Sequence, residues 1–183
     1  MNWRDRTTCV LFGDGAGAVV LERVEDGGFL GFELGSDGSG GFDLCVPAGG
    51  SRAPASPATI EQDLHFLQMN GREVYKFATR AMVSSAEQLL AKCGLTVADV
   101  DVYVPHQANL RIIDHAVRHL GLAPEKVRIN VDRYGNTSSA SVPLCLHEAL
   151  ADGALRAGQT VLMSAVGAGL SWGSALVVWG DAR

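Results

Sequence analysis

Two segments of this sequence place polar side chains between a short apolar run and a helical pattern. His106 and Asn109 follow residues 100–104, and Asn136 follows residues 127–131. In α/β proteins, sites form where strands of the sheet end. An imidazole nitrogen can hydrogen-bond a substrate, and an asparagine amide can donate to developing negative charge. We therefore predict that His106 and Asn136 converge on one rim of a sheet.

Each of these residues also has a purely structural interpretation. His106 could simply cap the turn after its strand, and Asn136 could be an ordinary helix N-cap. Asn109, or the free N–H groups of the helix that follows it, would favour an anion. Two polar groups at the ends of parallel strands meet on the same rim, and this pairing favours the functional interpretation for both.

Two glycine-rich segments invite opposite interpretations. Residues 167–173 form a predicted turn between strands, whose backbone N–H groups could point at an oxyanion. Residues 13–17 resemble a dinucleotide-binding loop but lead into a strand pattern instead of a helix, which argues against a nucleotide site. The remaining histidines are expected to be structural or solvated: His65, His115, His119 and His147.

The four cysteines lie far apart and include no CxxC pair, so neither a zinc site nor a disulfide framework is expected. None follows a loop that leads into a helix N-terminus, the setting that lowers a thiol pKa. No candidate nucleophile is therefore visible among Cys9, Cys45, Cys93 and Cys145.

The elements that must position these residues alternate between strand and helix. Apolar residues at helical spacing predict helices over residues 71–93 and 110–120, and a helix with small residues at its start over 137–150. Strands are predicted at residues 8–12, 18–24, 29–34, 100–104, 127–131, 161–166 and 174–179. This order predicts a mainly parallel sheet covered by helices, with an antiparallel last strand.

Residues 10–21 and 165–178 share one layout, a strand, a glycine turn and an alternating strand. We interpret them as two copies of one hairpin, each closing an α/β layer, so the chain is expected to start in mid-domain. The loop at residues 35–59, rich in Gly, Ser, Pro and Ala, is the expected internal boundary.

A net charge of −5 argues against a nucleic-acid-binding protein, which needs a basic face to neutralise phosphates. No apolar run approaches the roughly 18 residues of a membrane span, and the first five residues lack the apolar core of a signal peptide. We expect a soluble, cytoplasmic protein without nucleic-acid or membrane partners.

Four motifs together resemble the β-ketoacyl-acyl-carrier-protein synthase III family. They are RTTCVLFGDGAGA at residues 6–18, PHQAN at 105–109, YGNTSSAS at 134–141 and GLSWG at 169–173. The resemblance covers nearly the whole chain, and the His-Gln-Ala-Asn form differs from related condensing enzymes that use two histidines.

The resemblance implies an α/β thiolase fold of two similar halves in five layers, acting as a homodimer. Residues 51–183 would be the C-terminal half, with a mixed sheet covered by helices, and residues 1–50 the terminal strands of the N-terminal half. Family members join a short acyl group from acyl-CoA to malonyl-acyl-carrier protein without cofactor or metal. Their nucleophilic cysteine lies in the first half, so this chain alone is expected to be inactive.

Roles for single residues also come only from the resemblance. His106 and Asn136 would stabilise the enolate formed when carbon dioxide leaves, and the N–H of Ala168 would face the acyl oxyanion. Gly71, Tyr75 and Asn109 would line the pantetheine tunnel, and Lys76, Arg111 and Arg118 would meet the acidic carrier protein.

Two positions depart from the family pattern, and two other functions stay open. Val166 stands where the family commonly has Phe, which leaves the primer length open, and Ala168 stands where it has Gly. The alternatives are a non-catalytic module that binds carrier protein or CoA, and a sibling condensing enzyme of secondary metabolism.

Overall fold

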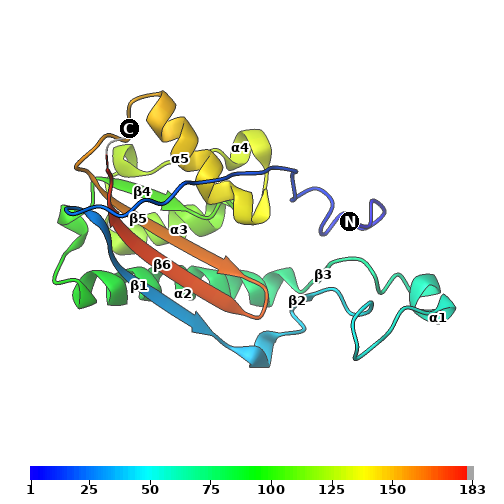
Figure 1. Cartoon of the computed structure of the whole chain (residues 1–183). Helices are drawn as coiled ribbons and strands as arrows, with labels where there is room; N and C mark the ends of the chain where they lie inside the picture. The colour runs from blue at the N-terminus through cyan, green and yellow to red at the C-terminus, as the bar shows by residue number, and fades with distance from the viewer. Residues whose placement is uncertain (181–183) are drawn as a thin grey trace.

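The computed structural model describes residues 1–180 and has a four-stranded sheet at its centre (Figure 1). The strands lie in the order β1–β6–β5–β4, and their bounds are Gly28–Ser36 for β1, Val102–Pro105 for β4, Thr160–Gly167 for β5 and Ser171–Val178 for β6. Only the β4–β5 pair is parallel. The predicted mixed sheet is confirmed, whereas the expectation of a mainly parallel one is wrong, because the β5–β6 hairpin takes β1 onto its edge in antiparallel register.

Helices cover both faces of this sheet. Tyr103 of β4 points toward α2 (Gly71–Lys92) and α3 (Leu110–Leu120), whereas its neighbours Val102 and Val104 pack against α5 (Ser141–Ala151). This split follows from the alternation of side chains along a strand. The sheet is therefore the middle layer of three, with α2 and α3 on one side and α5 on the other (Figure 1).

Periodicity located the long helices well. The predictions at residues 71–93 and 110–120 are confirmed by α2 and α3, and Gly121 ends α3 in the left-handed conformation with φ 69°. Glycine adopts this conformation without the steric cost that a Cβ would bring.

Shorter elements complete the chain. They are the ribbon of β2 (Leu44–Cys45) and β3 (Gln68–Met69), the helices α1 (Pro57–Glu61) and α4 (Val131–Tyr134), and 3-10 turns at Gly38–Gly40, Val97–Asp99, Pro124–Lys126 and Ser138–Ala140.

The strands predicted at residues 8–12 and 18–24 do not form. Residues 8–11 make turns, Phe12 makes one bridge to Asn136, and residues 13–24 have no regular secondary structure. A strand forms when the backbone of a neighbouring strand hydrogen-bonds to its N–H and C=O groups. Within residues 1–180, the bridge of Phe12 to Asn136 is the only such pairing of residues 8–24. The predicted pair of similar hairpins is therefore wrong for the first copy.

Two further boundaries differ from the sequence-based expectation. The strand expected at residues 127–131 is reduced to a bridge between Val127 and Tyr103, and α4 begins at Val131. The helix expected from residue 137 begins at Ser141, because Ser138 has φ 53° and a 3-10 turn precedes α5. A residue at positive φ cannot continue an α-helix.

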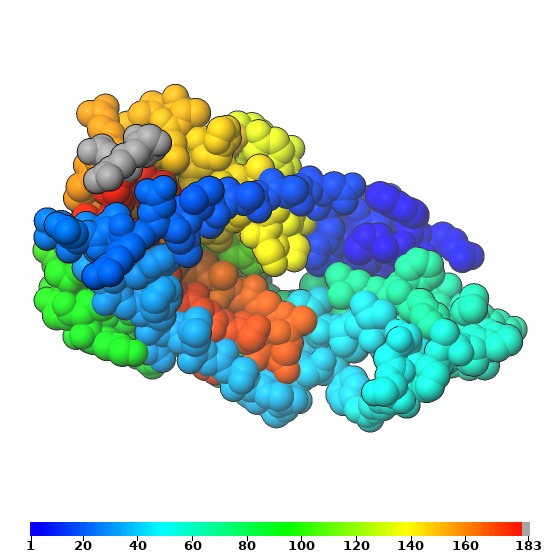
Figure 2. Space-filling view, viewed as in Figure 1, coloured from blue at the N-terminus to red at the C-terminus, as the bar shows by residue number. Residues whose placement is uncertain are grey.

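The N-terminal glycine segment packs directly on α5 and the turn before it. A Cβ on Gly13 would lie 2.0 Å from the carbonyl oxygen of Tyr134, and one on Gly17 would lie 2.5 Å from Pro143 Cγ. Because these residues lack a Cβ, the backbone of the N-terminal segment can lie close to Tyr134 and Pro143. Figure 2 shows this segment crossing the surface of α5. This segment thus covers part of the surface of α5.

The β1 strand pairs with β6 from Gly28 to Ser36, with one irregularity between Phe29 and Gly31, and so shares a sheet with β4 and β5. The division of the chain into residues 1–50 and 51–183 stays a prediction.

Candidate active site

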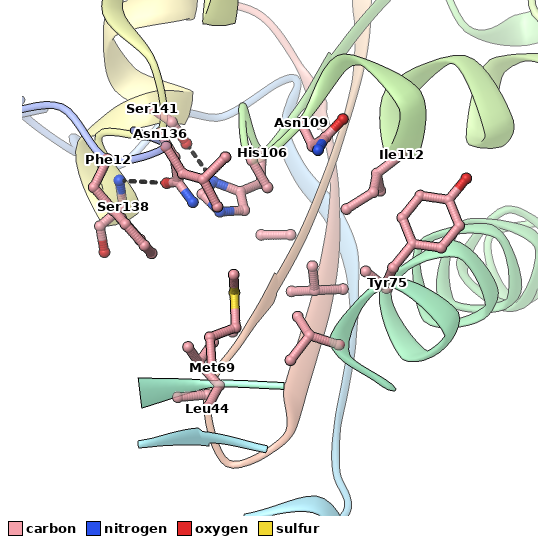
Figure 3. A pocket seen from close by; sticks show the side chains of 18 of the residues that line it. Phe12, Leu44, Met69, Tyr75, His106, Asn109, Ile112, Asn136, Ser138 and Ser141 are labelled. Carbon is pink, nitrogen blue, oxygen red and sulfur yellow. Dashed lines mark hydrogen bonds between the residues drawn. The ribbon is translucent and has the colours of Figure 1, made fainter. Parts of the chain in front are cut away.

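A cavity of about 730 Å³ opens where the C-terminal ends of β4 and β5 approach the start of α2 (Figure 3). Most of the side chains around it are apolar, including those of Met69, Val74, Ile112 and Val142. The cavity brings together seven residues singled out in the sequence: Gly71, Tyr75, His106, Asn109, Asn136, Val166 and Ala168.

His106 is held at its backbone and at one ring nitrogen. Its N–H donates to the carbonyl oxygen of Ser164 on β5 at 2.8 Å, and its Nδ1 lies 2.6 Å from Ser141 Oγ. Burial lowers the pKa of His106 to about 4, because the imidazolium would lose its hydration. The ring is therefore neutral near pH 7, and its second nitrogen, Nε2, faces the cavity (Figure 3).

Asn136 is clamped by the N-terminal segment. Its backbone N–H donates to Leu11 O at 2.9 Å, and its carbonyl accepts from Gly13 N at 2.9 Å. The side-chain Oδ1 accepts from Ser138 N at 2.9 Å, which leaves the Nδ2 amide as the free donor end. The Asn136 side chain lies beside the His106 ring (Figure 3). The structure thus places both polar groups at one rim, although Asn136 follows α4 and not the strand that the argument assumed.

Gln107 connects the segment of His106 to the segment that leads toward Asn136. Its side chain is fully buried, and Oε1 accepts from Asn130 N at 2.9 Å and from Val131 N at 3.2 Å. Its Nε2 donates to Pro105 O at 2.7 Å and to Arg128 O at 3.2 Å. This one amide therefore joins the end of β4 to residues 128–131.

Ser141 and Gln107 were not identified as site residues from the sequence. Both belong to motifs that we quoted, but a hydroxyl or amide in a motif does not reveal its partner. The partners lie 35 residues away for Ser141 and 21 to 24 residues away for the distant bonds of Gln107.

Of the other cavity residues, Gly71 and Tyr75 come from the first turns of α2, and Ala168 lies in the turn between β5 and β6. Asn109 Oδ1 accepts from Arg111 N at 2.9 Å, so it is the N-cap of α3 as well as part of the cavity wall.

The three predicted carrier-binding residues lie outside the cavity. Arg111 and Arg118 are exposed on α3. Lys76 is exposed on α2 and forms an ion pair with Glu73 at 2.7 Å, which also lowers the pKa of that carboxyl through a hydrogen bond.

None of the residues that line the cavity is a cysteine. Cys145 is buried on the face of α5 that packs on β4, and its pKa is raised to about 12 by desolvation and by the nearby Glu148 carboxylate. A thiol in this state is a poor nucleophile at neutral pH. Within residues 1–180 we find no group of three or more His, Cys, Asp or Glu side chains placed to hold a metal ion.

Two family models match the sequence. Residues 1–38 match 3-oxoacyl-[acyl-carrier-protein (ACP)] synthase III, and residues 90–179 match 3-oxoacyl-[acyl-carrier-protein (ACP)] synthase III C terminal. The chain belongs to the β-ketoacyl-acyl-carrier-protein synthase III family. The resemblance recognised in the four sequence motifs is thereby confirmed.

Relatives in the synthase III family are close in sequence. The β-ketoacyl-[acyl-carrier-protein] synthase III of Symbiobacterium thermophilum is 58% identical over 181 residues, which are 98% of this chain and 55% of that protein. The corresponding protein of Caldanaerobacter subterraneus is 54% identical over 180 residues, 98% of this chain and 54% of that protein. The chain thus spans about half the length of these synthase III relatives.

Solved synthase III structures share the fold. The enzyme from Thermus thermophilus superposes with a TM-score of 0.83 at 45% identity, covering 100% of this chain and 56% of that one. The Aquifex aeolicus protein gives a TM-score of 0.85 at 40% identity, covering 97% and 53%. The fold is therefore the thiolase-like α/β fold of synthase III enzymes. No helix within residues 1–180 has the length and apolarity needed to cross a membrane.

Proposed function

We propose that this chain supplies the enolate-stabilising residues of a β-ketoacyl-acyl-carrier-protein synthase III. That enzyme condenses a short acyl-CoA with malonyl-acyl-carrier protein, with loss of carbon dioxide. The observation that carries the proposal is the placement of the His106 ring and the Asn136 amide side by side in an apolar cavity (Figure 3).

The chemistry follows from where charge develops. When the malonyl thioester loses carbon dioxide, the electron pair of the broken C–C bond moves onto the thioester oxygen and forms an enolate. Two N–H donors fixed at that oxygen stabilise it more than they stabilise the neutral carbonyl, which lowers the barrier. The enolate carbon then attacks the acyl group, and the thiol that carried this group leaves.

Donors that are already oriented need little reorganisation during the reaction. Asn136 is held by its bond to Ser138 N, and His106 by its bond to Ser141. The mostly apolar wall of the cavity lowers the local dielectric constant, and this strengthens each hydrogen bond to the developing charge.

The remaining residues take supporting roles in this proposal. The N–H of Ala168 faces the acyl oxyanion. An alanine is acceptable there, because Ala168 does not have the positive φ that would favour glycine. Gly71, Tyr75 and Asn109 would line the path of the pantetheine arm.

Exposed basic side chains on α2 and α3 suit an acidic carrier protein, which would dock beside the cavity. They are Lys76, Arg111 and Arg118. We also propose a homo-oligomer acting in the cytoplasm, where acyl-CoA and carrier protein are available. No cofactor is required, since acyl-CoA is a substrate.

We propose that the acyl-accepting thiolate is not one of the four cysteines of this chain, because none lines the cavity. Complete condensation would then require a cysteine supplied from outside these 183 residues.

A sibling condensing enzyme is the second candidate. The priming β-ketosynthase of the R1128 polyketide biosynthetic pathway superposes with a TM-score of 0.84 at 37% identity, covering 98% of this chain and 53% of that one. This likeness supports a role in starting a secondary metabolite, and the preferred acyl and carrier substrates distinguish the two functions.

Decarboxylation of malonyl-acyl-carrier protein tests the proposal, because this half-reaction needs enolate stabilisation and no thiolate. We expect the chain to release labelled carbon dioxide, and His106→Ala or Asn136→Ala to slow release by roughly 100-fold. The control is His147→Ala, since His147 is exposed on α5. Binding of malonyl-acyl-carrier protein without carbon dioxide release would favour the non-catalytic module and contradict the proposal.

A further inference from the structure

The hydroxyl of Ser141 is the ring partner of His106. Ser141 is the first residue of α5, only 1% of it is exposed, and its Oγ lies 2.6 Å from His106 Nδ1. Within residues 1–180 the Ser141 hydroxyl has no other hydrogen-bond partner than this nitrogen (Figure 3).

This arrangement decides where the protons are. If His106 Nδ1 carried the proton, Ser141 Oγ would accept it, and the buried hydroxyl hydrogen would be left without an acceptor. A buried polar hydrogen without a partner is costly. If the Ser141 hydroxyl donates to Nδ1, both groups are satisfied, and the ring proton must sit on Nε2.

We propose that Ser141 is a positioning residue that holds His106 in the Nε2–H tautomer and so aims an N–H donor at the substrate oxygen. The functional part of this inference rests on the proposed function above. The tautomer itself depends only on the geometry.

The rigidity of both partners supports the inference. His106 directly follows β4 and is fixed there by the hydrogen bond from its backbone N–H to the carbonyl oxygen of Ser164 on β5. Ser141 is fixed because α5 packs against β4 through Cys145 and Ala149, next to Val104. The two side chains therefore come from elements that share one core and cannot drift apart independently.

A neutral ring makes the tautomer matter. At neutral pH His106 carries a single ring proton, since burial keeps its pKa low. Only one nitrogen can then donate, and an unprotonated Nε2 would repel the developing enolate. The hydroxyl on the far side of the ring thus orients the imidazole, as the carboxylate does in hydrolase triads, but it donates to Nδ1 instead of accepting from it. It therefore selects the opposite tautomer, with the proton on Nε2, and adds no charge.

Nitrogen-15 NMR of the imidazole rings tests the tautomer directly. The His106 signals are assigned by their loss in His106→Gln. In the wild-type chain at pH 7 we expect a protonated Nε2 and an unprotonated, hydrogen-bonded Nδ1. A wild-type ring that is protonated at Nδ1 overturns the inference without any need for a variant of Ser141.

Removing the hydroxyl should change the ring and leave the fold intact. In Ser141→Ala we expect the Nδ1 signal to lose its hydrogen-bond shift and the ring to become a mixture of tautomers. Ser139→Ala is the matched control, because Ser139 precedes α5, is exposed and makes no side-chain hydrogen bond within residues 1–180. Identical ring signals in wild type and Ser141→Ala would also overturn the inference.

Malonyl-acyl-carrier protein decarboxylation adds the functional readout. We expect Ser141→Ala to lower the maximal rate roughly tenfold with little change in carrier-protein affinity, as for the loss of a residue that orients a catalytic group. If the wild-type chain shows the expected tautomer but releases no carbon dioxide, the proposed function fails and the structural role of Ser141 stands. If decarboxylation is seen and Ser141→Ala matches wild type in rate, the positioning role is refuted.

Discussion

Gln107→Leu should strongly destabilise the protein although it changes no atom of the proposed catalytic groups. The buried amide of Gln107 makes four hydrogen bonds, two as acceptor from the backbone N–H groups of Asn130 and Val131 and two as donor to backbone carbonyls. Leucine has a similar volume, so the change removes the hydrogen bonds without opening a large cavity.

The size of the effect follows from the groups left behind. A buried N–H group that loses its acceptor costs about 1–3 kcal/mol. Within residues 1–180 the N–H groups of Asn130 and Val131 bond to Gln107 Oε1 alone, so together they should cost about 4 kcal/mol. This is a large share of the ~5–15 kcal/mol that stabilises an ordinary domain.

Urea unfolding of the 183-residue chain measures this cost. We expect a much lower midpoint for Gln107→Leu at an unchanged slope, and faster hydrogen exchange at Asn130 and Val131. Gln88→Leu is the matched control, because Gln88 is exposed on α2 and leucine is a good helix former there. A Gln107→Leu protein within about 1 kcal/mol of wild type would refute the claim that this amide holds the two segments together.

Further outcomes follow from the same geometry. The pKa of His106 is about 4 in the folded protein and about 6.5 in the unfolded chain. As the pH falls, the unfolded chain therefore binds a proton at this residue before the folded protein does, and the free energy of unfolding should decrease by roughly 3 kcal/mol between pH 6.5 and pH 4. Unfolding measured across this range should show a shallower fall in His106→Gln, and equal slopes would contradict the burial argument. Radiolabelled acetyl-CoA should leave no thioester on the chain, and a labelled cysteine that turns over would show that a nucleophile is present. Reversing the charges of Arg111 and Arg118 to Glu should weaken carrier-protein binding and its salt dependence, whereas unchanged affinity would place the docking surface elsewhere. Sedimentation should show that the chain associates, because apolar side chains such as Val20, 88% exposed, and Leu34, 74% exposed, face solvent. A single species of monomer mass at high micromolar concentration would contradict this expectation.

Local patterns in the sequence were sufficient where an element is defined by its own residues. The apolar spacing of α2 and α3 and the glycine that ends α3 are sequence-local features, and both helices appear close to the predicted bounds. The strand ends that carry His106 and Ala168 could also be located, because short apolar runs and the turn after each are visible in the chain. The family resemblance rested on motifs of the same local kind.

Strand formation was decided by neighbours. Residues 8–12 and 18–24 have the composition of strands but find no partner strand within residues 1–180, whereas residues 28–36 pair with β6. Hydrogen bonds in a sheet are made between segments, so strand propensity alone does not determine whether they form.

The hydrogen bonds that orient the candidate site also needed the tertiary structure. The sequence by itself determined that His106 follows a strand and indicated that Asn136 lies on the same rim, although the strand expected before Asn136 does not form. Only the fold decided that Ser141 reaches His106 from α5 and that Gln107 reaches residues 128–131. The physical reason is that a buried polar group must find its partner wherever packing brings one, and packing joins residues that are distant in the chain.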